Sequence, residues 1–176
     1  MKRSTQYKVN TEHQTSDNKP LISPAEKFWY TWLQVVATIT IVIGTLMAVF
    51  NHTDLFRVVN EKLEVIYFTE TIITAEIESM QYWLVSLIGA ILAAWGILVY
   101  YLITIPLKQK QVWAWNAIVI SLIIWFVFDT WASFKWGAEF NLLMNLIFGF
   151  QYAAPLLFLR NSMKKSELIR IESDEY

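Results

Sequence analysis

The sequence predicts an all-α polytopic membrane protein: an antiparallel bundle of four transmembrane helices with an amphipathic helix in its first extracytoplasmic loop. Four apolar stretches, at residues 28–50, 82–105, 112–134 and 139–159, are each long enough to cross about 30 Å of hydrocarbon at about 1.5 Å per residue. Hydrophobic residues make up 56% of the 176-residue chain and charged residues only 16%, below the level of about 25% in soluble domains. The charged residues lie mainly between the apolar stretches.

The start of the first span is marked by a helix-capping pattern. Ser23 is placed as the N-cap, Pro24 takes the first helical position, and Glu26 completes a capping box. The polar residues 1–22 before it predict a cytoplasmic tail without fixed structure. The apolar stretch lacks a small-residue cleavage site, so we interpret this span as an uncleaved anchor.

The loop at residues 51–81 is too long and too patterned for a simple connector. Apolar residues recur at helical spacing through its first half, and Thr53 or Asp54 is placed to cap them. This pattern predicts an amphipathic helix that lies on the bundle or at the membrane boundary. A second helical piece is predicted to lead from Thr74 into the second span.

Two prolines mark the later spans. Pro106 has no amide hydrogen and predicts the end of the second span. The connector after it, at residues 107–111, is short, so the second and third spans are predicted to be antiparallel neighbours. Pro155 leaves the carbonyl of Gln151 without its usual helical partner and predicts a kink in the fourth span.

The distribution of basic residues predicts the orientation. Eleven of the fourteen Lys and Arg residues lie in the two tails and in the connector between the second and third spans. The positive-inside rule then places both termini in the cytoplasm. We therefore expect a multi-pass protein of the cell membrane, of the bacterial inner-membrane type, with a membrane domain at residues 23–160 and a cytoplasmic C-tail at residues 161–176.

Composition also excludes several function classes. The net charge of −1 offers no basic field for nucleic acid. The absence of cysteine excludes disulfides, thiolate zinc sites and iron–sulfur clusters, and neither histidine lies in a span to ligate haem. Glu70, Glu76 and Glu78 near His52 match no known ligand spacing, so we interpret them as a solvated acidic face. No cofactor and no metal are predicted.

Small residues follow one another at four-residue spacing on two of the spans. Thr40, Gly44 and Ala48 form such a line on the first span, and Gly89 and Ala93 form one on the second. Small side chains let helix backbones approach closely in a membrane. These lines therefore predict helix packing faces.

Asp129 is the only acidic residue well inside an apolar span. An ionisable side chain at that depth is unfavourable by about 2.5–3.5 kcal/mol, so it should face protein or water. In an antiparallel third and fourth span, Asp129 comes level with Asn145, and Ser133 comes level with Asn141. Trp125, one turn away from Asp129, is placed to form an aromatic wall.

Two interpretations of this polar group stay open. In the first, the four side chains only specify helix packing, at about 0.6 kcal/mol for each hydrogen bond. In the second, they line a pocket in the outer half of the bundle, roofed by His52, Glu78 and Gln81. The carboxyl group of Asp129 would then exchange protons or bind a cationic or hydroxylated ligand.

Three functions follow from the second interpretation, in order of preference. The first is binding of a lipophilic small molecule or of a membrane partner, a second copy of the chain or another membrane subunit. The second is a membrane enzyme that uses Asp129 or Glu78 in acid–base chemistry on a lipid-soluble substrate. The third is an oligomeric small transporter. No catalytic residue is assigned. The lipid bilayer is the expected environment of the protein.

The last two predicted spans share a pattern of aromatic, polar and small residues. The third span carries the stretch WFVFDTWAS at residues 125–133, and the fourth follows with Gly137, Asn141, Asn145 and Pro155. This pattern resembles the last two spans of small bacterial four-helix membrane proteins of the BphX-like and DoxX-like type. The resemblance covers the C-terminal third and implies a four-helix inner-membrane protein. A more distant similarity to sterol-isomerase and sigma-2-receptor bundles implies a lipophilic ligand pocket.

Overall fold

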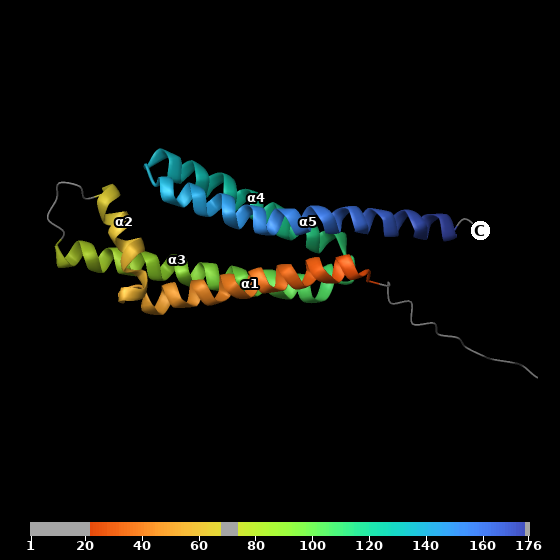
Figure 1. Ribbon diagram of the computed structural model, residues 1–176, viewed down its shortest axis with the longest axis horizontal. Helices are drawn as coiled ribbons and strands as arrows, with labels where there is room; N and C mark the ends of the chain where they lie inside the picture. The colour runs from red at the N-terminus through yellow and green to blue at the C-terminus, as the bar shows by residue number, and fades with distance from the viewer. Residues whose placement is uncertain (1–21, 68–73, 175–176) are drawn as a thin grey trace, which may run out of the picture.

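The computed structural model describes residues 22–67 and 74–174, and the side chains of these except residues 63, 65–67 and 165–174. The predicted N-tail up to residue 21 and Glu70 lie outside the described residues. Every regular element in the described ranges is helical (Figure 1). In chain order the elements are α1 (Pro24–Phe50), η1 (Asp54–Phe56), α2 (Arg57–Tyr67), α3 (Ala75–Leu102), η2 (Ile103–Leu107), α4 (Val112–Lys135) and α5 (Glu139–Asp174).

Four helical segments have the length and hydropathy of membrane spans: Pro24–Phe50, Ala75–Leu107, Val112–Lys135 and Glu139–Lys164. The predicted all-α class with four apolar helices that could cross a membrane is confirmed. Between 17% and 28% of the most apolar window of each span is buried inside the protein. The remaining apolar side chains face outward, as a surface in contact with lipid requires.

The beginnings of α1 and α3 follow their capping residues. The hydroxyl of Ser23 accepts a hydrogen bond from the amide of Glu26 at 3.2 Å, and the Glu26 carboxylate accepts one from the amide of Ser23 at 2.6 Å. The predicted capping box is confirmed, with Pro24 in the first turn. α3 begins directly after Thr74, where the lead into the second span was predicted.

The ends of two spans differ from a simple apolar boundary. Pro106 lies inside η2, a π-helical turn, so the helix continues to Leu107 before it stops. α5 passes through Pro155 and runs on to Asp174, so the described part of the predicted C-tail is helical. At 36 residues α5 is about 54 Å long, which exceeds the hydrocarbon thickness of about 30 Å. The kink at Pro155 stays a prediction.

The long helices associate as two pairs, α1 with α3 and α4 with α5 (Figure 1). In the first pair the backbones touch at the predicted lines of small residues. A Cβ atom on Gly44 would lie 2.5 Å from the backbone nitrogen of Ala93, and one on Gly89 would lie 2.5 Å from that of Ala48. Only glycine fits at these two positions, so the predicted packing faces are confirmed between α1 and α3.

The two pairs meet at one end of the molecule and diverge toward the other (Figure 1). We call the end around Tyr30 and Met163 the joined end, because α1 contacts α5 there and η2 contacts both α1 and α4. The opposite end, around Asn51 and Asn141, is the splayed end. α2 stands at the splayed end, at an angle to the long helices (Figure 1).

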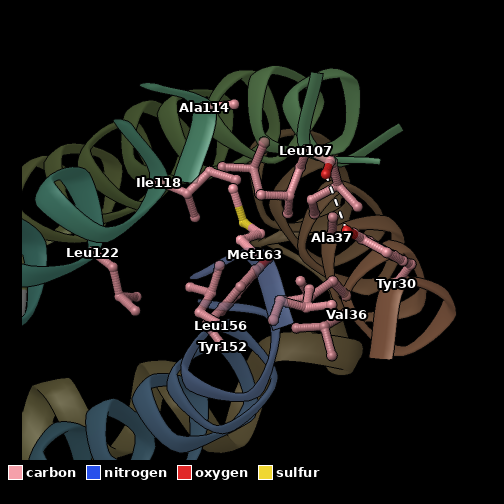
Figure 2. Packing of buried hydrophobic residues seen from close by; sticks show 14 residues of the cluster. Tyr30, Val36, Ala37, Leu107, Ala114, Ile118, Leu122, Tyr152, Leu156 and Met163 are labelled. Carbon is pink, nitrogen blue, oxygen red and sulfur yellow. Dashed lines mark hydrogen bonds between the residues drawn. The ribbon is translucent and has the colours of Figure 1, made fainter. Parts of the chain in front are cut away.

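The hydrophobic core extends from the joined end to the middle of the spans. In Figure 2, buried side chains of α1, η2, α4 and α5 converge, and the hydroxyl of Tyr30 donates a hydrogen bond to the carbonyl oxygen of Leu107 at 3.0 Å. This core holds the two helix pairs together. Its members are Tyr30, Leu33, Val36, Ala37, Val99, Ile103, Leu107, Ala114, Ile118, Leu122, Tyr152, Leu156, Leu159 and Met163.

Candidate functional site

Three of the predicted site residues come together between α4 and α5 at the splayed end. The side-chain amide of Asn141 donates to Oδ2 of Asp129 and to the hydroxyl of Ser133, both at 2.8 Å. The hydroxyl of Ser133 in turn donates to the backbone carbonyl of Asp129 at 2.7 Å. We call these three residues the Asp129 cluster. Its hydrogen bonds tie the end of α4 to the beginning of α5.

Asn145 lies beside the cluster but has a different partner. Its amide is buried and donates to the hydroxyl of Thr130 at 3.3 Å, not to Asp129. Asn141, one turn nearer the beginning of α5, reaches both Asp129 and Ser133 instead. Asn141 therefore lies level with Ser133, as the sequence predicted, whereas Asn145 bonds Thr130, the residue after Asp129, rather than Asp129 itself.

The carboxylate of Asp129 has few partners for its depth in the span. It is half-buried, and Asn141 is the one donor to its oxygens among the described residues, although a carboxylate can accept about four hydrogen bonds. No ion pair to Asp129 occurs within the described ranges. Lys135, the cation nearest along α4, lies over the rings of Trp131 and Trp136, 5.0 and 5.2 Å from their centroids. The cluster therefore has spare capacity to accept hydrogen bonds.

Trp125 lies one turn before Asp129 in α4, and its role as an aromatic wall of the site stays a prediction. It is half-buried, packs against the hydrophobic core and contacts the neighbouring ring of Phe126, with centroids 6.3 Å apart. The Phe126 ring lies over Gly149, where a Cβ atom would come within 3.3 Å of it. Phe126 thus packs against α5 at the one position where that helix has no side chain.

His52 and Glu78 lie on the other helix pair. The carboxylate of Glu78 accepts a hydrogen bond from the hydroxyl of Tyr82 at 2.5 Å, and the ring of His52 faces the same tyrosine edge-on at 6.5 Å. Both His52 and Glu78 are exposed. No contact among the described residues joins them to Asp129. The structure therefore divides the predicted site residues into two groups, and the roof over Asp129 stays a prediction.

A polar network at the end of α1 holds the beginning of α2. The side-chain amide of Asn51 donates to Ser86 at 2.7 Å, that of Asn60 donates to the carbonyl of Asn51 at 2.8 Å, and that of Gln81 donates to the carbonyl of Asn60 at 3.4 Å. The side-chain oxygens of Asn51, Asn60 and Gln81 are buried and accept no hydrogen bond in the described part of the chain. Sequence patterns missed this network because its members lie in three separate elements.

A second polar site, at the joined end, was also missed. Glu26 is only 3% exposed, and its carboxylate pairs with the ammonium group of Lys110 at 2.9 Å and accepts a short hydrogen bond from the hydroxyl of Ser162. It therefore links α1, the connector between the pairs and α5. The sequence identifies Glu26 as a capping residue, but no local pattern points to partners so far away in the chain.

Chemically, these sites offer hydrogen bonding and charge. Among the described residues no group of three or more His, Cys, Asp and Glu side chains could hold a metal ion. Comparisons with protein-family models, with curated proteins and with solved structures found no match. The functional assignment therefore depends on the sites themselves.

Proposed function

We propose that the protein crosses a cell membrane four times as an antiparallel bundle, with both termini in the cytoplasm. The charge distribution supports this orientation, since eleven of its fourteen basic residues belong to the two tails and the connector at the joined end. The splayed end then faces outward. There, Leu55 and Val58 at the beginning of the loop helix are about two-thirds exposed, at 65% and 62%, as expected for an amphipathic helix at the membrane boundary.

In this membrane the protein binds a lipophilic small molecule that carries a cationic or hydroxyl group. The observation that carries this proposal is the Asp129 carboxylate, which lies in an apolar span with one donor and no cation among the described residues. An ionisable group at membrane depth needs a partner, because hydrocarbon solvates neither charge nor hydrogen bonds. A hydroxyl or ammonium group of a ligand would supply that partner.

The divergence of the helix pairs gives the apolar part of such a ligand a place to bind. Tyr152 donates to the hydroxyl of Thr40 at 3.0 Å and packs against Trp95 at 5.4 Å. From these residues to the splayed end, every hydrogen bond and ring contact among the described residues lies within one of the two pairs. None of them joins one pair to the other. Phe128 and Leu146 are exposed there, at 65% and 60%, and offer apolar surface near Asp129.

The same surface would also accept a membrane subunit or a second copy of the chain. The enzyme and transporter alternatives need further ionisable groups beside Asp129. Glu78 is exposed and paired with Tyr82 on the other helix pair, so the described contacts do not assemble an acid–base pair with Asp129. Binding requires Asp129 alone.

Mass spectrometry of organic extracts from purified protein tests the proposal. Wild type should release a small molecule that Asp129→Asn no longer retains, because the amide lacks the charge that binds the polar group. Glu139→Gln is the matched control, since it removes an exposed carboxylate at the beginning of α5, near the cluster but not part of it. Equal extracts from all three proteins, with weaker association of α4 and α5 in Asp129→Asn, would favour the packing interpretation and contradict binding.

A further inference from the structure

A shallow groove runs along the outward surface of the α1–α3 pair, near the joined end. Its volume is about 240 Å³, and it lies away from the Asp129 cluster. Two threonine hydroxyls, an amide and a tyrosine ring line it, although the surrounding surface is apolar. The lining residues are Thr31, Gln34, Val35, Thr38, Ile39 and Tyr100.

In the membrane orientation proposed above, on which this step rests, the groove would cross from headgroup depth into hydrocarbon. Thr31 lies one turn after Lys27, whose carbonyl accepts its hydroxyl at 2.9 Å. Thr38 lies seven residues further along α1, or about 10 Å deeper at the helical rise. One end of the groove is therefore level with exposed cationic side chains, while its other end lies among Val35 and Ile39, which are exposed and apolar.

A lysine stands at the polar end and contacts the lining directly. The ammonium group of Lys108 donates to Oε1 of Gln34 at 3.4 Å, and Nε2 of Gln34 donates to the hydroxyl of Thr104 at 3.2 Å. An ammonium group has three hydrogens and an amide nitrogen has two. Lys108 and Gln34 therefore keep donors for another acceptor at the mouth of the groove.

We propose that this groove binds an anionic phospholipid. The phosphate would contact Lys108, the ester oxygens would accept from Gln34, and one acyl chain would lie over Val35 and Ile39. Charge complementarity selects this occupant, because a cation at headgroup depth attracts anionic lipids and the apolar half of the groove accepts their chains. The site is independent of the ligand proposed at Asp129.

Native mass spectrometry of the full chain, with added phosphatidylglycerol or phosphatidylcholine of equal chain length, tests the proposal. Wild type should bind phosphatidylglycerol more tightly. Lys108→Gln should weaken phosphatidylglycerol binding about fivefold, the effect of one basic residue near an anionic headgroup, and should weaken the binding of the zwitterionic phosphatidylcholine less. Thr38→Phe should weaken both lipids because the ring fills the groove.

Matched controls separate this site from general basic charge. Lys164→Gln removes an exposed cation at the same end, and Thr45→Phe adds a ring on α1 beyond the groove. Both should bind the lipids as wild type does. Equal binding of the two lipids by wild type, an effect of Lys164→Gln as large as that of Lys108→Gln, or no effect of Thr38→Phe would overturn the proposal. Displacement by free glycerol phosphate would overturn the choice of a lipid.

Discussion

The contact between α1 and α3 makes a strong prediction at Gly89. In Gly89→Ala the new Cβ atom would lie 2.5 Å from the backbone nitrogen of Ala48 and 2.6 Å from the carbonyl oxygen of Gly44. Ordinary van der Waals contact begins at 3.4 Å, so the two backbones must separate by nearly 1 Å. Overpacking of this kind lowers the free energy of unfolding by about 1–3 kcal/mol, and two backbone atoms cannot move aside as a side chain can.

Gly149→Ala is the matched control, because its Cβ atom would meet only the ring of Phe126, at 3.3 Å. Both substitutions replace glycine by alanine inside a helix. Each therefore gains about 1 kcal/mol of helix propensity, and this gain cancels when the two variants are compared. Unfolding in detergent, followed by tryptophan fluorescence, should therefore show Gly89→Ala less stable than Gly149→Ala by about 1–3 kcal/mol. Equal stability of the two variants would refute the proposed backbone contact.

Other substitutions test the links between the helix pairs by the same unfolding measurement. Tyr152→Phe removes a buried hydroxyl that joins the pairs and should destabilise the protein by about 0.6–1.7 kcal/mol. Tyr82→Phe is its control, because that hydroxyl bonds an exposed carboxylate. It should change the stability by less than about 0.5 kcal/mol. Lys110→Met leaves the Glu26 carboxylate buried without this cation and should destabilise by about 3 kcal/mol, with the exposed Lys164→Met near wild type. Similar losses in each matched pair would contradict these links.

Local sequence features predicted the helices well because each depends on neighbouring residues. The four apolar stretches, the capping box at Ser23 and the small-residue faces at Gly44 and Gly89 all depend on spacing along one helix. The end of α5 was less predictable, since the polar residues after the apolar stretch continue the helix as far as Asp174. Hydropathy marks where a span leaves lipid rather than where its helix stops.

Contacts between distant elements could not be predicted in this way. The pairing of Glu26 with Lys110 and Ser162 depends on how α1, the connector after η2 and α5 meet at the joined end. The divergence of the pairs likewise follows from where the buried core lies rather than from any one motif. At the candidate site the spacing predicted that Asn141 lies level with Ser133, but not that the same amide also reaches Asp129 while Asn145 bonds Thr130.

The amount of small molecule retained by each purified chain tests most directly whether the Asp129 carboxylate binds a ligand inside the membrane. Quantitative mass spectrometry should find about one molecule per wild-type chain, the same amount in Glu139→Gln, and a loss in Asp129→Asn. Retention of the same amount by Asp129→Asn, with the protein still folded, would contradict the assignment of Asp129 as the polar contact.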